Sequence, residues 1–154
     1  MTIVGIGNTE MGDDGIGVLL TQMASERPPA GGWPLSVEFV CAGRDPALAA
    51  ALLAEGKELL LIDAVDMKDA PGSWRVFSPG ELAPGTAHAP AGSSHTLSMD
   101  EVLELACSLG WADRLRILGI QAGDVRPGRF LSPGVRRCMP EVLARIREEA
   151  EALS

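Results

Sequence analysis

One stretch, residues 58–65, is almost entirely apolar and has the sequence Glu-Leu-Leu-Leu-Ile-Asp-Ala-Val. Such a run, without alternating polar residues, is typical of a strand that is buried on both faces. Strands of this kind occur mainly in parallel sheets that are covered by helices. The stretch therefore predicts a central strand, with Asp63 near its carboxyl end. A carboxylate in so apolar a setting needs a partner.

The rest of the chain alternates between strand and helix patterns. Further strands are expected at residues 2–6, 36–41, 73–77 and 115–121, and helices are expected up to residue 26, at 47–54, from 98 to 109 and from 132 onward. This order predicts the α/β class: a three-layer α/β/α sandwich around a mostly parallel, five-stranded twisted sheet. At this length we expect a single domain, 1–154.

Several local signals mark the ends of the helices. Asp45 precedes a proline and is expected to cap a helix, and Ser98 with Glu101 has the capping-box spacing. Ser132 and the proline after it open the last helix, which must kink or restart at Pro140. The loop at residues 78–92 is unusually long for a compact domain, and such loops are often functional. The apolar face of the third helix is expected to be Met99, Val102, Leu103, Ala106 and Leu109.

A polar, glycine-rich turn follows the first expected strand and ends in two adjacent carboxylates, Asp13 and Asp14. Gly5 and Gly7 allow a close approach of the backbone. We expect Asp13 either to cap the next helix or to support a neighbouring ligand, and Asp14 to lie in the first turn of that helix. Turns of this type usually bind phosphate. Because this turn has two negative charges and no Lys or Arg, it favours a cation or a metal-bearing partner instead.

Composition excludes several classes of protein. A hydrophobic share of 46% with 22% charged residues is that of a globular chain, and the net charge of -8 opposes binding to nucleic acid or an anionic membrane. We find no apolar run of transmembrane length and no basic signal-peptide region. Cys41, Cys107 and Cys138 form no disulfide framework. We therefore expect a cytoplasmic protein with reduced, mostly buried thiols.

Three potential ligands follow three separate strands of the expected sheet: Asp14, Asp63 and His95. The loops after parallel strands meet at one edge of a sheet, where ligands bind. Two carboxylates and an imidazole suit a divalent transition metal and leave coordination positions open. The alternatives are that Asp14 is a helix-terminus carboxylate without chemistry and that His95 is an exposed loop histidine. His88 is expected to be spare, and the remaining carboxylates considered are expected to be surface charges: Glu10, Asp66, Asp69 and Asp100.

At these residues the sequence resembles the hydrogenase maturation endopeptidase family, the proteases that trim nickel–iron hydrogenase large subunits. The resemblance covers nearly the whole chain. It rests on the opening run GIGNTEMGDDGIG, the strand LLLIDAVD, the segment SSHTLSMDEVL, and the run LSPGV with Pro140 after it.

The resemblance implies an aspartyl-type endopeptidase that removes a C-terminal extension from a nickel–iron hydrogenase large-subunit precursor after nickel insertion. The catalytic and nickel-recognising residues of the family match Asp14, Asp63 and His95, and the nickel is expected to arrive with the substrate. Asp14 and Asp63 are both candidates for the general base. We expect a cytoplasmic monomer whose partner is the precursor, with no nucleic acid and no membrane.

Two loops depart from the family pattern. Relatives often have an Asp-Gly-Gly-Thr-like run where this chain has residues 41–45, and a Pro-Glu step where it has Ala122-Gly123. We expect these loops to change which large subunit is recognised. Two other functions stay open: a nickel-sensing or chaperone-like protein that binds the large subunit without cutting it, and a nucleotide- or flavin-binding protein, which the two carboxylates of the turn oppose.

Overall fold

The computed structural model describes residues 1–82 and 98–152. Five strands form one sheet in the order β2-β1-β3-β5-β4. Their bounds are β1 (Thr2–Ile6), β2 (Glu38–Gly43), β3 (Leu59–Val65), β4 (Trp74–Phe77) and β5 (Leu115–Gln121). The first three strands and β5 run parallel, whereas β4 runs antiparallel to β5. The predicted five-stranded, mostly parallel sheet is thus confirmed.

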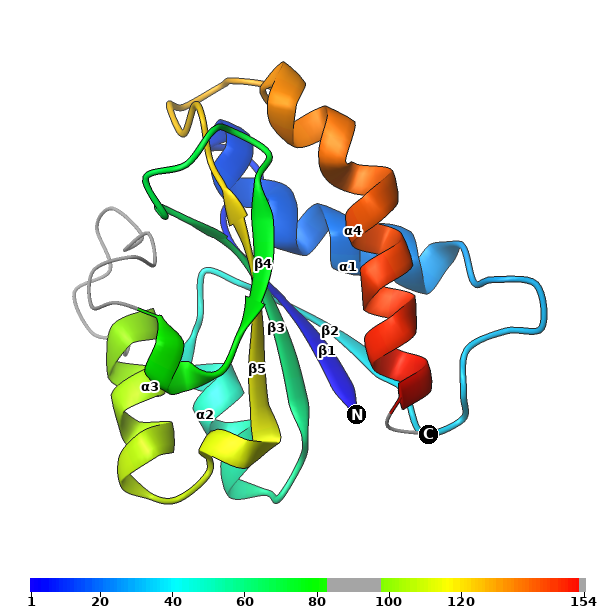
Figure 1. The fold of residues 1–154 in the computed structure, drawn as a ribbon, viewed down its shortest axis with the longest axis vertical. Helices are drawn as coiled ribbons and strands as arrows, with labels where there is room; N and C mark the ends of the chain where they lie inside the picture. The colour runs from blue at the N-terminus through cyan, green and yellow to red at the C-terminus, as the bar shows by residue number, and fades with distance from the viewer. Residues whose placement is uncertain (83–97, 153–154) are drawn as a thin grey trace.

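Helices cover both faces of this sheet (Figure 1). They are α1 (Ile16–Glu26), α2 (Ala47–Ala54), α3 (Met99–Ser108) and α4 (Pro133–Ala152), with short 3-10 turns η1 (Gly12–Gly15), η2 (Pro79–Glu81) and η3 (Ala112–Arg114). One apolar cluster joins the sheet to α1 and α4, and a second joins it to α2 and α3. The three layers match the predicted sandwich. Within the described parts of the chain, no helix is long and apolar enough to cross a membrane.

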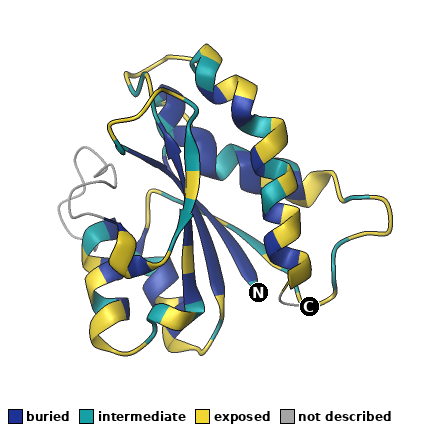
Figure 2. Cartoon of the chain, in the orientation of Figure 1, coloured by how far each residue is buried: buried dark blue, intermediate teal, exposed yellow. Residues whose placement is uncertain are grey.

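Every residue of β3 is buried, as the sequence of this strand predicts (Figure 2). Successive side chains of a strand point to opposite faces. Leu59 and Leu61 pack in the cluster of α2 and α3, whereas Leu60 and Ile62 pack in the cluster of α1 and α4. By this alternation Asp63 belongs to the face that α2 and α3 cover.

The local helix signals act as expected. The hydroxyl of Ser98 accepts a hydrogen bond from the backbone N–H of Glu101, and the Glu101 carboxylate accepts one from the N–H of Ser98 at 2.6 Å. Asp45 is an exception: the N-cap of α2 is Pro46, without a side-chain cap, although the Asp45 carboxylate accepts a hydrogen bond from the N–H of Ala47 at 3.1 Å. Helix α4 starts at the predicted proline and runs on through Pro140, so the chain does not restart there.

Two expectations about burial are wrong. Cys41 and Cys107 are exposed, and only Cys138 is buried. Cys41 lies on β2, which forms an edge of the sheet and pairs only with β1. Leu109 is 52% exposed because α3 ends just before it and the chain turns away at Gly110. The end of the predicted stripe on α4, Leu153, lies outside the described residues.

Candidate functional site

The strand order reverses direction between β1 and β3. From β1 the chain crosses to β2 on one side, and it later adds β3 on the other side of β1. In open α/β sheets, ligands bind beyond the carboxyl ends of the strands at such a switch point. Asp14 follows the end of β1, and Asp63 lies near the end of β3. The topology therefore places these two carboxylates at the edge of the sheet where ligands bind.

Both carboxylates line one small cavity at this edge. The described residues that form it are Ile6, Gly7, Asp14, Arg44, Pro46, Asp63 and Met99. The cavity has about 10 Å³ of space that the centre of a water molecule can occupy. This is room for one water or ion. The structure thus brings together two of the three predicted ligands.

The third predicted ligand, His95, lies outside the described residues, as does His88. Over residues 1–82 and 98–152, no group of three or more His, Cys, Asp or Glu side chains is placed to hold a metal ion. The cavity therefore has two carboxylates from the described part of the chain. The role of His95 stays a prediction.

Asp63 is the most electrostatically perturbed group of the cavity. Its side chain is only 3% exposed. Burial raises the pKa of Asp63 well above its usual value, and the negative charge of Asp14 raises it further, whereas the backbone N–H of Ala64 lowers it. Two carboxylates in one small, water-poor space repel each other unless a proton or a cation lies between them. The pair is therefore suited to take up a cation.

Asp14 is held in place by the turn in which it lies. Its carboxylate accepts a hydrogen bond from the backbone N–H of Asn8 at 2.9 Å. Gly7 has a φ of +132°, and a Cβ at this position would lie 1.9 Å from the backbone oxygen of Asp14. Only glycine fits so close an approach in this conformation. The turn therefore closes on itself and fixes Asp14 at the cavity.

Of the two roles expected for Asp13, helix cap or support of a neighbouring ligand, the first is wrong. Asp13 does not cap the helix that follows, because neither η1 nor α1 has a side-chain cap. The side chain is fully buried and accepts hydrogen bonds from the N–H groups of Gly123 and Asp124, at 2.7 and 2.9 Å. Ser132 donates two more, from its N–H and its hydroxyl, both at 2.7 Å. Asp13 thus connects the turn of Asp14 to the segment between β5 and α4.

Of the two loops that depart from the family pattern, the first borders the cavity and the second contacts the turn that carries Asp14. Arg44 and Pro46 line the cavity itself. The loop after β5 contacts that turn through the hydrogen bond from Gly123 to Asp13. Of the expected surface charges, Asp69 is exposed and pairs with Arg75 at 3.3 Å.

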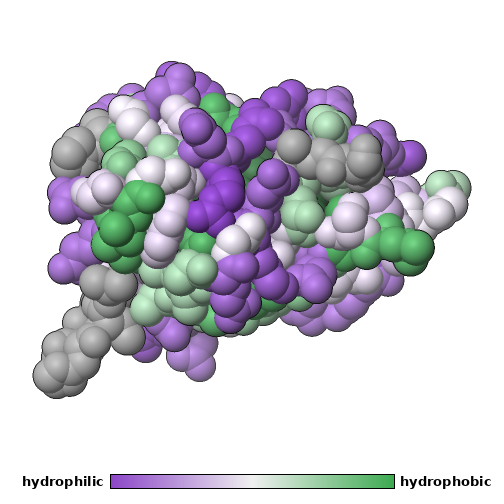
Figure 3. Space-filling view, turned by 90° about the horizontal axis from the view of Figure 1, so that it is seen from below, coloured by the Kyte–Doolittle hydropathy of each residue, from purple (hydrophilic) through white to green (hydrophobic). Residues whose placement is uncertain are grey.

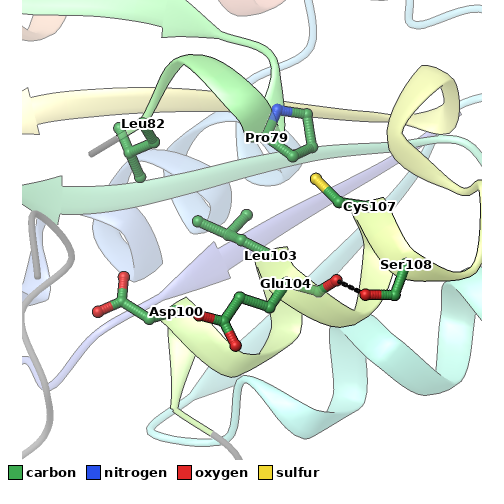
Figure 4. A pocket seen from close by; sticks show the side chains of 7 residues that line it. All are labelled: Pro79, Leu82, Asp100, Leu103, Glu104, Cys107 and Ser108. Atoms are coloured by element: carbon green, nitrogen blue, oxygen red, sulfur yellow. Dashed lines mark hydrogen bonds between the residues drawn. The ribbon is translucent and has the colours of Figure 1, made fainter. Parts of the chain in front are cut away.

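A larger cavity of about 320 Å³ lies between η2 and α3 (Figure 4). Its lining residues are Pro79, Leu82, Asp100, Leu103, Glu104, Cys107 and Ser108. Asp100 and Glu104, the two carboxylates among these described residues, both come from α3 and not from the ends of two strands. The end of the molecule seen in Figure 3 shows hydrophilic and hydrophobic patches side by side.

Comparison with known proteins points to one family. The family model described as hydrogenase maturation protease (HycI) matches residues 19–149. The chain is 30% identical over 144 residues to the hydrogenase expression/formation protein HupM of Azotobacter chroococcum mcd 1, which covers 92% of this chain and 67% of that protein. It is 35% identical over 78 residues to the hydrogenase 3 maturation protease of Escherichia coli K12, and this match spans 51% of this chain and 48% of that protein.

Solved structures show the same architecture. The crystal structure of the [NiFe] hydrogenase maturation protease HycI from Thermococcus kodakarensis KOD1 superposes with a TM-score of 0.71 at 21% identity, over 97% of this chain and 91% of that one. The hydrogenase maturating endopeptidase HybD from E. coli gives 0.69 at 23% identity, over 94% and 88%. At these identities the likeness establishes the fold.

Proposed function

The chain belongs to the hydrogenase maturation protease family, and we propose that it is an aspartyl-type endopeptidase acting in the cytoplasm as a monomer. Its substrate is the precursor of a nickel–iron hydrogenase large subunit, from which it removes the C-terminal extension after nickel has been inserted. The observation that supports this most is the pair of carboxylates, Asp14 and Asp63, in one cavity at the switch point of the sheet.

Nickel arrives with the substrate and serves as the recognition element. Asp14, Asp63 and His95 bind it together. His95 is included because it precedes Met99 by four positions in the sequence, and Met99 lines the cavity. The buried carboxylate of Asp63 has its pKa raised by burial and by Asp14, so a cation in the cavity relieves an unfavourable charge. A precursor without nickel lacks this anchor, and it is left uncut.

The chemistry of cleavage follows from this placement. Nickel held beside the scissile carbonyl polarises it or lowers the pKa of a bound water. The carboxylates align the peptide bond by proximity. Asp14 and Asp63 both lie at the cavity and are both candidates for the general base.

The test compares nickel-loaded with nickel-free precursor, incubated with the purified chain and followed by mass spectrometry. We expect a mass loss from the loaded precursor only. Asp63→Asn and His95→Ala should slow cleavage by about 100-fold or more, since small misplacements of a reacting group have effects of this size. Asp66→Asn, the same change three residues along the chain, is the control.

Normal cleavage of the loaded precursor by Asp63→Asn and His95→Ala would contradict the role given to nickel. If the wild-type chain binds the loaded precursor and leaves its mass unchanged, the protein is the non-cleaving binder instead.

A further inference from the structure

One segment of the chain has the opposite charge to the rest. Residues 126–137 include four of the 13 basic residues, and no acidic residue occurs from position 125 to 140. The rest of the chain has nine basic residues against 21 acidic ones. The four basic residues are all exposed: Arg126, Arg129, Arg136 and Arg137.

Phe130 follows Arg129 in the sequence of this segment and is 88% exposed. Burying an aromatic ring of this size is favourable, and an exposed one marks a surface that a partner can cover. Phenylalanine and arginine are both enriched where proteins contact one another. We name Arg126, Arg129, Phe130, Arg136 and Arg137 the arginine–phenylalanine surface.

This surface is fixed to the turn that holds Asp14. The N–H of Gly128 donates a hydrogen bond to the backbone oxygen of Glu10 at 2.9 Å. Gly12 has a φ of +56°, and a Cβ there would lie 3.2 Å from the Cβ of Arg129. In Figure 1 the segment between β5 and α4 accordingly lies beside the turn after β1. A partner on this surface is therefore next to the turn that carries Asp14.

Most of the positive charge of the surface is available to a partner. Arg126 donates two hydrogen bonds to Asp124, at 2.9 and 2.6 Å, and the Nε of Arg129 lies 3.8 Å from the same carboxylate. Arg136 donates to the backbone oxygen of Leu131, which leaves its charge uncompensated. Arg137 forms no ion pair with any described residue. Among the described residues, Asp124 is thus the one carboxylate that pairs with this surface, and it pairs with Arg126 and Arg129.

We propose that the arginine–phenylalanine surface docks an acidic segment of the precursor protein, with an apolar side chain of that segment against Phe130. This inference rests on the proposed function. Charge attraction would steer the precursor toward this end of an otherwise acidic molecule, and the adjoining turn then places its metal centre at Asp14 and Asp63. Nucleic acid is disfavoured as an occupant because the chain has a net charge of -8.

The test measures the dissociation constant and the KM of nickel-loaded precursor with variants of the full chain. Arg137→Glu should weaken binding about tenfold in 50 mM salt, and the difference should shrink in 1 M salt, where charges are screened within about 3 Å. Phe130→Ala should weaken binding at both salt concentrations. Arg27→Glu is the matched control, because Arg27 is exposed and follows the far end of α1. Values of kcat should not change.

Wild-type affinity and KM in Arg137→Glu and Phe130→Ala would overturn the docking surface, as would equal weakening by Arg27→Glu. Failure of the wild-type chain to bind the precursor would also overturn it. So would a dimer of this chain that Arg137→Glu dissociates, because the surface would then contact a second copy. The proposed function is judged separately by cleavage. If the precursor binds through this surface but stays uncut, only the cleavage fails. If all variants cut it with the wild-type KM, only the docking fails.

Discussion

Ser132 donates two hydrogen bonds to Asp13, one to each carboxylate oxygen, although the two residues lie 119 positions apart in the sequence. Ser132 immediately precedes α4, and Asp13 immediately precedes Asp14. The first residues of the longest described helix are thereby tied to the turn that positions one of the two cavity carboxylates.

Replacing Asp13 should therefore cost much stability. Asp13→Ala removes a fully buried acceptor of four hydrogen bonds and leaves the N–H groups of Gly123, Asp124 and Ser132 without it. Hydrogen bonds to charged groups contribute about 1.5–3 kcal/mol each, and such effects are not additive. We expect the free energy of unfolding to fall by roughly 3 kcal/mol or more, measured by urea denaturation.

The control is Asp45→Ala, which removes an exposed carboxylate that accepts one hydrogen bond, from Ala47. Loss of one hydrogen bond of this kind costs about 1 kcal/mol. If Asp13→Ala were no more destabilising than this control, the hydrogen bonds of Asp13 would contribute little to the free energy of unfolding.

Asp63 should make the protein less stable at neutral pH than it is in acid. Its pKa in the folded state is raised above its ordinary value of 3.8 by burial and by Asp14. Below pH 3.8 the protonated carboxyl of Asp63 makes its full contribution to the stability of the folded state. This contribution is lost as the pH rises through the folded-state pKa. Asp63→Asn removes the buried charge and should therefore raise the free energy of unfolding at pH 7.5. We expect a gain of about 1–3 kcal/mol, the usual cost of a buried polar group without a partner.

Urea denaturation of Asp63→Asn and wild type at pH 7.5 and at pH 5 measures this effect. The advantage of the variant should shrink at the lower pH, and the exposed Asp113→Asn should show no such trend. An Asp63→Asn variant that is less stable than wild type at pH 7.5 would mean that Asp63 makes favourable contacts in the folded state.

Periodicity and local signals were sufficient to predict most of the fold. The apolar run of β3 predicts a strand buried on both faces, and the strand has no exposed residue. The capping box at Ser98 is purely local in sequence, and it starts α3 as expected. Placing Asp14 and Asp63 at one edge needed only the order of strands and helices, because loops after parallel strands meet there.

Features that depend on distant parts of the chain were missed. Capping statistics favour Asp13 as a helix cap, but its partners lie 110 to 119 positions away, and no local pattern shows them. Glu149 is another case, since it is 2% exposed on α4 and pairs with Arg145 at 2.6 Å and with Arg116 on β5. Its spacing from Ile146 puts it on the buried face, so helical periodicity could have revealed its burial, though not the partner on β5.

The loop at residues 41–45 should influence which precursor is cut. Arg44 lines the cavity with Asp14 and Asp63, so replacing this loop changes the lining of the proposed site. Replacing residues 41–45 with the corresponding loop of a paralogous protease should change the ratio of kcat/KM for the two cognate precursors by about tenfold. The measurement is cleavage of both loaded precursors in one mixture. An unchanged ratio would show that specificity lies elsewhere.

In the proposed function, Asp14 and Asp63 bind one and the same nickel ion. Anomalous diffraction from crystals soaked in nickel tests it most directly, with Asp63→Asn crystals as the comparison. We predict one nickel peak in the cavity, within about 2.2 Å of a carboxylate oxygen from each residue, and a much weaker peak in the variant. Nickel bound to only one of the two carboxylates, or bound outside the cavity, would contradict the account.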